Sequence, residues 1–142
     1  MATKKKSAPA KYADKSAGQP ELKPLFDKLR KLVAAYEKGN YRAKADKPGQ
    51  YELYYDKEVE VAGRKYPELG FAGVLIQKGY VGFYFFPVYL DESFKEQIGA
   101  ELLKTLKGKT CFHIKKDDEV IFSQVKEALA GGWQDYQQRG WR

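Results

Sequence analysis

Residues 71–87, FAGVLIQKGYVGFYFFP, carry the strongest indication of the fold in this sequence. Two runs rich in β-branched and aromatic residues, 71–77 and 80–90, flank the dipeptide Lys78-Gly79. Apolar runs around a short glycine turn are typical of an antiparallel β-hairpin. Pro87 has no backbone N–H to donate, so we expect it to end the second strand or to lie at a sheet edge.

Both faces of the second strand of this hairpin carry aromatic side chains. Because side chains alternate along a strand, one face holds Val81, Phe83 and Phe85, and the other holds Tyr80, Gly82, Tyr84 and Phe86. This pattern fits a central strand that is buried on both sides. The alternative is that Tyr80, Tyr84 and Phe86 form an uncovered aromatic surface that binds a small ligand or a protein partner.

Three helices are expected in the rest of the chain. Apolar residues at i, i+3, i+4 and i+7 between Leu22 and Tyr36 predict an amphipathic helix that ends at Gly39-Asn40. A middle helix is expected over 91–108, with Asp91 as its N-cap. The last helix is expected over 120–136, where Gly131-Gly132 could bend or split it.

Strands are expected between and after these helices. Residues 41–50 look like a polar loop, 51–61 like one bent strand or two strands, and 62–70 like a turn-rich segment. Residues 110–114 are short and apolar, as in a β-strand. The order of elements indicates an α+β fold, with an antiparallel sheet of about four to six strands packed against N-terminal, middle and C-terminal helices.

The positive charge is concentrated at the N-terminus. The chain of 142 residues carries a net charge of +7, and residues 1–20 hold five lysines and one aspartate, leaving +3 for the rest. This segment has almost no large apolar groups, so we predict a disordered basic tail over 1–20 and a single domain over 21–142. The tail, with Lys4, Lys5 and Lys6, either contacts nucleic-acid phosphates or only increases solubility.

Composition also limits the location and the covalent chemistry of the protein. No apolar run approaches the roughly 20 residues of a membrane span, and the lysine-containing start has no apolar core of a secretory signal. The single cysteine excludes an internal disulfide and fits a reducing compartment. We therefore expect a cytoplasmic protein, either a monomer or a homodimer.

Cys111 and His113 are the only cysteine and histidine in the chain, and they lie two positions apart. On a strand they would point to the same side. A metal site would need further ligands, for which the carboxylates Asp117 and Asp118 are the candidates. The alternative is a structural strand with one small thiol and one histidine at an edge.

No catalytic arrangement of residues is evident in the sequence. There is no Ser-His-Asp order, His-Glu-x-x-His motif or dinucleotide-binding loop. Residues 78–83 match the aromatic strand motif of RNA-recognition domains only in part, because Gly82-Phe83 lie one position later in the sequence than the motif requires. A shift by one residue moves the aromatic side chains to the opposite face of the strand. We therefore expect a non-enzymatic binding or accessory domain.

Several motifs together resemble a known family. The strand end GFYFFP (82–87), the segment LKGKTCFHIKKDD (106–118) and the closing GWQDYQQRGW (132–141) are similar to the YdhG-like family of small bacterial proteins of unknown function. The resemblance covers about Leu22 to Trp141 and implies a compact α+β domain. Some relatives are described as similar to the iron-delivery protein frataxin, so the resemblance also implies possible iron handling. Frataxin-like proteins use an acidic ridge on the first helix, whereas the first helix here is rich in lysine and arginine.

Overall fold

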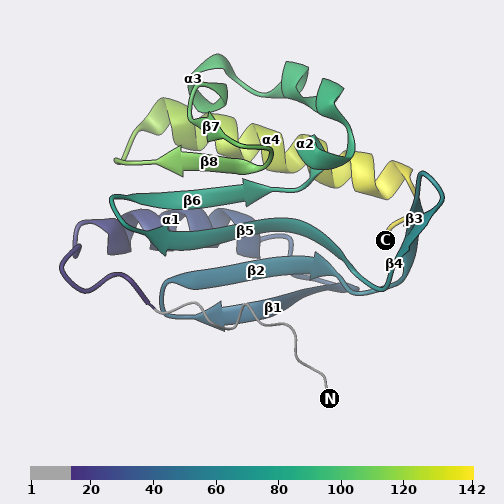
Figure 1. The fold of residues 1–142 in the computed structure, drawn as a ribbon, viewed down its shortest axis with the longest axis horizontal. Helices are drawn as coiled ribbons and strands as arrows, with labels where there is room; N and C mark the ends of the chain where they lie inside the picture. Colours follow the sequence, from purple (N-terminus) through teal and green to yellow (C-terminus); the bar gives the residue numbers. More distant parts are fainter. Residues whose placement is uncertain (1–13) are drawn as a thin grey trace.

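The computed structural model describes residues 14–142 (Figure 1). The helical elements are α1 (Leu22–Ala34), α2 (Pro87–Leu90), the 3-10 helix η2 (Glu92–Gln97), α3 (Ala100–Leu103) and α4 (Glu119–Gln138). The strands are β1 (Tyr41–Lys47), β2 (Gln50–Tyr55), β3 (Val59–Val61), β4 (Arg64–Tyr66), β5 (Leu69–Gln77), β6 (Tyr80–Phe85), β7 (Leu106–Lys107) and β8 (Cys111–Ile114).

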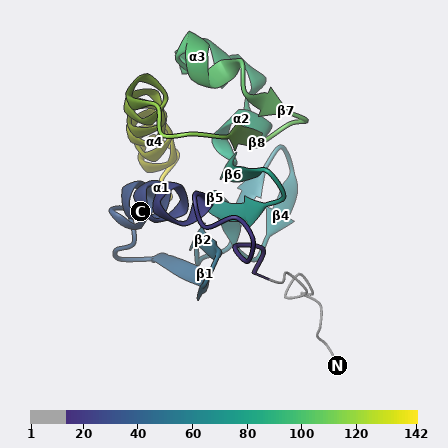
Figure 2. The ribbon, with the colours of Figure 1, turned by 90° about the vertical axis from the view of Figure 1, so that its left-hand side faces the viewer.

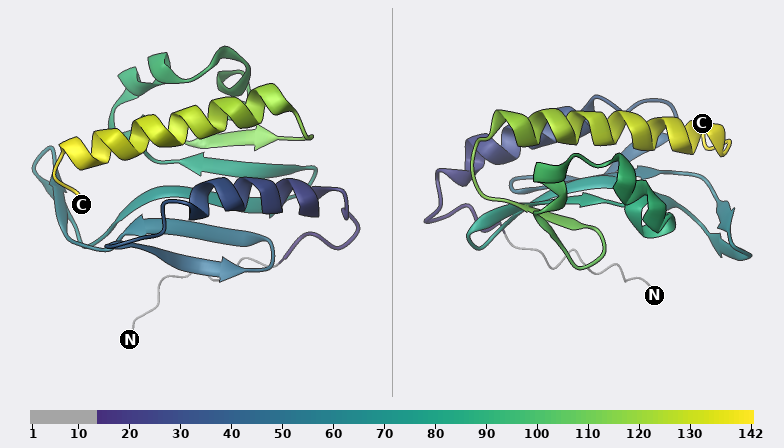
Figure 3. Two further views of the ribbon diagram at one scale, coloured as in Figure 1. Left: turned by 180° about the vertical axis from the view of Figure 1, so that it is seen from behind. Right: turned by 90° about the horizontal axis from the view of Figure 1, so that it is seen from above.

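Six strands form one antiparallel sheet in the order β1-β2-β5-β6-β8-β7, and β3 and β4 form a separate ribbon. Helices α1 and α4 lie side by side on one face of the sheet (Figures 2 and 3). The expected α+β class with an antiparallel sheet is confirmed. Within residues 14–142, none of the helices combines the length and the apolar character that crossing a bilayer requires.

The hairpin predicted from residues 71–87 forms the centre of the sheet. Strands β5 and β6 pair with Val74 opposite Phe83 and Ala72 opposite Phe85, and both phenylalanines are fully buried beneath the helices. Strand β6 ends at Phe85, and Pro87, two residues later, starts α2, so the strand ends near this proline as expected. The alternation of faces along 80–86 therefore holds, and it assigns one aromatic set to the core.

Two of the predicted loops contain strands. The expected polar loop 41–50 is wrong, because Tyr41–Lys47 forms the edge strand β1. An edge strand buries few side chains, and here Arg42 and Lys44 both pair with Asp56 at the sheet surface, so the sequence of this strand is polar. Residues 51–61 contain two strands, and the turn-rich segment contains β4 after a turn in which both Ala62 and Gly63 have positive φ.

The expected single helix over 91–108 is also wrong. The segment divides into η2, α3 and β7, and Ile98 between the first two has an extended backbone. At the next residue, a methyl group on Gly99 would overlap the side chain of Gln124, whose Oε1 accepts a hydrogen bond from the Leu102 amide at 2.8 Å. This contact with α4 replaces the helical hydrogen bonds that the apolar spacing alone favoured.

Helix α4 runs without interruption through Gly131-Gly132. A Cβ atom on Gly132 would lie 2.7 Å from the Phe85 ring and 2.9 Å from Pro87, so the glycine allows the helix to approach the end of β6 closely. The pair of glycines therefore reflects packing and not a break in the helix.

The segment before α1 contacts the β5–β6 turn. Gln19 Nε2 donates to the carbonyl oxygen of Gln77 at 3.1 Å, and the amide of Gly79 donates to Gln19 Oε1 at 2.6 Å. Residues 14–20, which we assigned to the basic tail, thus contact the domain. The predicted disorder of residues 1–13 and the proposed role of Lys4, Lys5 and Lys6 lie outside the described residues.

Candidate functional site

The sheet face opposite α1 and α4 is not covered by any helix of the described chain (Figures 2 and 3). Tyr80, Tyr84 and Phe86 are half-buried on this face, while Phe83 and Phe85 point into the core. The structure therefore separates the two aromatic sets of β6 as the alternation predicts. The set singled out as a candidate binding surface lies on the uncovered side.

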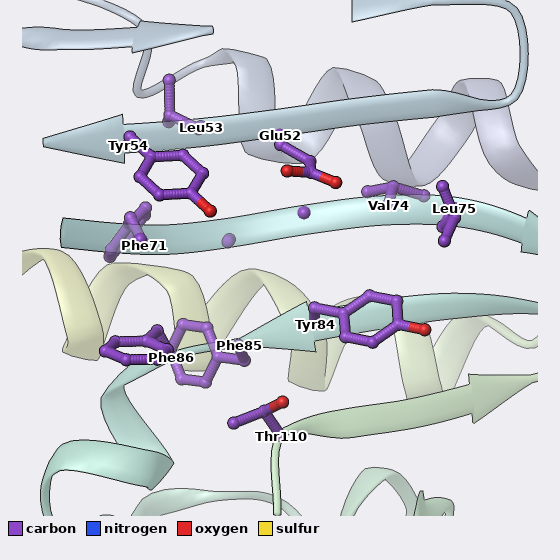
Figure 4. A pocket seen from close by; sticks show the side chains of 13 residues that line it. Glu52, Leu53, Tyr54, Phe71, Val74, Leu75, Tyr84, Phe85, Phe86 and Thr110 are labelled. Atoms are coloured by element: carbon purple, nitrogen blue, oxygen red, sulfur yellow. The ribbon is translucent and has the colours of Figure 1, made fainter. Parts of the chain in front are cut away.

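A shallow pocket follows β5 on this uncovered face, and we call it the trough (Figure 4). Its volume is about 220 Å³. The side chains and glycines that shape it are Glu52 and Tyr54 from β2, Gly70 and Gly73 from β5, and Tyr84 and Phe86 from the other side. Strand pairing places Glu52, Gly73 and Tyr84 in one cross-strand row and Tyr54 beside Gly70 in the next.

Glycines at two positions of β5 keep the trough open. A methyl group on Gly70 would lie 3.7 Å from the Tyr54 ring and 3.9 Å from the Phe86 ring, which is ordinary van der Waals contact. A methyl group on Gly73 would lie 3.3 Å from the carbonyl oxygen of Tyr51, which is tighter. A larger side chain at Gly70 would thus fill the space between the two rings with little disturbance of the backbone.

The β2 side of the trough carries a carboxylate. Glu52 Oε2 accepts a hydrogen bond from Gln50 Nε2 at 2.8 Å. Gln50 itself is only 4% exposed and does not line the trough. Burial raises the pKa of Tyr54, and the charges of Glu52 and Glu68 raise it further, which indicates a negative potential around the hydroxyl.

The opposite side of the trough carries neutral groups. Burial, with a smaller contribution from the Cys111 thiol, raises the pKa of Tyr84 to about 12, so the phenol stays protonated at neutral pH. Thr110 adds a hydroxyl to the lining on this side (Figure 4). A ligand in the trough would therefore meet a carboxylate on one side and uncharged aromatic and hydroxyl groups on the other.

Cys111 and His113 lie on β8 and point to the same sheet face, as expected from their spacing. A Cβ atom on Gly82 would lie 3.2 Å from Cys111 Sγ and 2.9 Å from the Tyr84 ring, so thiol and ring meet over this glycine. Burial raises the pKa of the thiol, which disfavours the nucleophilic thiolate. The His113 ring stacks on Tyr80 with centroids 3.7 Å apart.

The carboxylates expected to complete a metal site have other partners. Asp117 forms an ion pair with Lys28 at 3.0 Å, and Asp118 caps α4 by accepting from the amide of Val120 at 2.9 Å. Within the part of the chain that the structure describes, no three His, Cys, Asp or Glu side chains gather in a way that could hold a metal ion. Asp117 and Asp118 are thus not brought together with Cys111 and His113 as one ligand set.

Sequence reasoning found part of the trough and missed the rest. Tyr84 and Phe86 line it, but Tyr80 does not, because it lies at the other end of β6, opposite Gln77. Glu52 and Tyr54 were missed. The alternation in YELYY (51–55) places both on one face, but only the pairing of β2 with β5 brings that face beside Tyr84.

Comparison of the chain with protein-family models, with curated proteins and with solved structures found no match. Membership of the YdhG-like family therefore stays a prediction.

Proposed function

We propose that the protein is a small binding module whose trough takes a flat aromatic ligand that carries a hydrogen-bond donor. The observation that supports this most directly is the arrangement of rings around glycine. Tyr54 and Phe86 flank Gly70, and a methyl group there would lie at van der Waals distance from both rings. Aromatic side chains around a small open space on a sheet suit a flat ring, since stacked and edge-to-face contacts are favourable.

The size of the trough favours a small ligand. Pockets for drug-sized molecules usually enclose about 300–1,000 Å³, and the trough is smaller, at about 220 Å³. A single or fused ring system fits this space better than an extended substrate. A single aromatic or guanidinium side chain of a partner protein is similar in size, and a partner that presents one is the alternative occupant.

The preference for a donor comes from the β2 side of the trough. Glu52 presents a carboxylate in the lining of the trough. Hydrogen bonds to an ionised group are stronger than those between neutral groups, so a ligand that donates to this carboxylate gains free energy that an acceptor does not. The ligand should therefore carry an amino, amidine or similar group.

Benzamidine tests this proposal, because it combines one flat ring with a charged donor group, and benzoate serves as its acceptor counterpart. Titrations followed by NMR should show binding of benzamidine in the millimolar range, about −4 kcal/mol, and much weaker binding of benzoate. The expected shifts lie in the resonances of Tyr54, Tyr84 and Phe86. Equal binding of the two compounds would contradict the assigned donor preference.

Two variants locate the site. Gly70→Val should abolish benzamidine binding by filling the space between the rings, while the strand tolerates a β-branched residue. Glu52→Gln should weaken benzamidine binding several-fold, and Glu60→Gln, which removes a carboxylate from the separate β3–β4 ribbon, should leave it unchanged. Benzamidine binding that survives Gly70→Val would place the ligand elsewhere and overturn the proposal.

A further inference from the structure

A second concave surface lies at the β7–β8 edge of the sheet, and we call it the basic hollow. It has a volume of about 270 Å³. The charged and titratable side chains that line it are Lys104, Lys107, His113, Lys115, Lys116 and Asp118. The trough carries its carboxylate on β2, whereas the basic hollow lies beside β8, so the two sites have opposite charge and different positions on the sheet.

The lysines of the basic hollow form no ion pair within the described chain. None of its four lysines lies within ion-pair distance of a carboxylate among residues 14–142, whereas Lys28 and Lys44 elsewhere both form ion pairs. The one carboxylate in the lining, Asp118, already accepts hydrogen bonds from the amides of Val120 and Ile121 at the start of α4. Four lysines and one carboxylate therefore line the concave space, which leaves it with an excess of positive charge.

His113 reports on the potential inside the basic hollow. Its ring is held against Tyr80 of β6 by stacking, with an angle of 10° between the planes. Burial lowers the pKa of His113, and the charges of Lys107 on β7 and Lys115 on β8 lower it further. Burial disfavours any charge here, whereas the contribution of the two lysines shows a positive potential at the ring, and a positive potential favours an anion.

We infer that the basic hollow binds a phosphate group. Lysine is a common phosphate ligand because its ammonium group is a compact charge with three donors. Four lysines that line one cavity and form no ion pair within residues 14–142 suit a multiply charged oxyanion. The inference does not depend on the proposed ligand of the trough.

The phosphate group has two sources that the test must separate. A free phosphoanion would use the lysines alone. A single-stranded nucleic acid would use its phosphates in the same way and could also stack a base near the Tyr80–His113 pair, since aromatic side chains next to a basic groove are typical of such binding. The probes are pyrophosphate and a ten-residue oligothymidylate, both titrated at low ionic strength in a buffer without phosphate.

His113 provides the readout without further labelling, because it is the only histidine in the chain. On saturation with either probe, its ring proton resonances should shift, and the pKa of His113 should rise as the anion offsets the charges of Lys107 and Lys115. Binding of the oligothymidylate should weaken steeply with added salt.

A pair of double variants tests the site with equal loss of charge. K107Q/K115Q should lower the affinity for the probe at least tenfold. K23Q/K126Q, which removes two exposed lysines from α1 and α4, should change this affinity less than threefold. Binding of pyrophosphate with this pattern identifies a free phosphoanion site, and binding of the oligothymidylate alone identifies a nucleic-acid site. Binding of neither probe, or equal weakening by both double variants, overturns the inference.

Discussion

At the scale of single residues, the environment of Cys111 decides whether it is a reactive group. Its half-buried thiol lies close to the Tyr84 ring, and burial raises its pKa above the ordinary value. The thiolate is the nucleophilic form, so Cys111 should react with iodoacetamide more slowly than free glutathione at pH 7.5. Mass spectrometry of the alkylated protein over time measures the rate. Alkylation faster than that of glutathione would show an activated cysteine, contrary to this interpretation.

His113 should destabilise the protein in mild acid. Its pKa is lowered below the ordinary 6.5, so the unfolded chain binds a proton more readily than the folded protein between that lowered pKa and 6.5. The free energy of unfolding should therefore decrease as the pH falls from 7.5 through 6.5, and the decrease should end below the folded-state pKa. Urea unfolding at several pH values measures this. The His113→Phe variant should lack this step, and an equal step in that variant would assign it to other groups.

At the scale of secondary structure elements, two adjacent glycines of α4 should respond in opposite ways to alanine. At Gly131 the nearest contacts to an added Cβ are 3.4 Å away, so Gly131→Ala should raise the free energy of unfolding by up to about 1 kcal/mol through helix propensity. At Gly132 the added Cβ would lie 2.7 Å from Phe85, so Gly132→Ala should lower the free energy of unfolding, although alanine has the same advantage in helix propensity there. Urea denaturation of both variants measures the two changes. Stabilisation by both substitutions would show that α4 does not approach β6 as closely as described.

The elements that sequence patterns predicted well are those with a strong local period. The β5–β6 hairpin and helix α4 combine long apolar patterns with recognisable ends, and both form near the expected residues. Strand β1 was missed because an edge strand with charged outward side chains has no apolar run. The length of the middle helix was overestimated because the hydrophobic spacing of this segment is helical. The contact of Gly99 with Gln124 in α4 is a tertiary feature that this spacing does not contain. The trough depends on the register of three strands, which no local pattern contains.

At the scale of the whole molecule, the layered fold predicts that neighbouring residues of β6 differ in their importance for stability. Phe83 is fully buried between the sheet and the helices, whereas Tyr84 is half-buried on the uncovered face. Phe83→Ala should lower the free energy of unfolding by about 3–5 kcal/mol, and Tyr84→Ala by clearly less, about 1–2 kcal/mol, since only part of the ring leaves contact. Urea denaturation compares the two. Equal losses would mean that the outer face is a second core, which would remove the basis of the proposed binding surface.

The arrangement of charge across the sheet separates the two proposed binding surfaces. The trough has its carboxylate on β2, and the basic hollow has its lysines around β7 and β8. Strands β5 and β6 separate these two regions in the sheet order. A cationic ring and an anionic phosphate group would therefore prefer different ends of the sheet.

Whether the trough is a ligand site can be decided from the dissociation constants of benzamidine for the wild-type protein and for Gly70→Val, determined side by side by NMR. The uncovered aromatic face predicts millimolar binding by the wild type, with shifts centred on Tyr54, Tyr84 and Phe86, and no detectable binding by the variant while its fold is unchanged. Absence of binding by the wild type, or equal binding by both proteins, would contradict the claim that this face of the sheet is a ligand site.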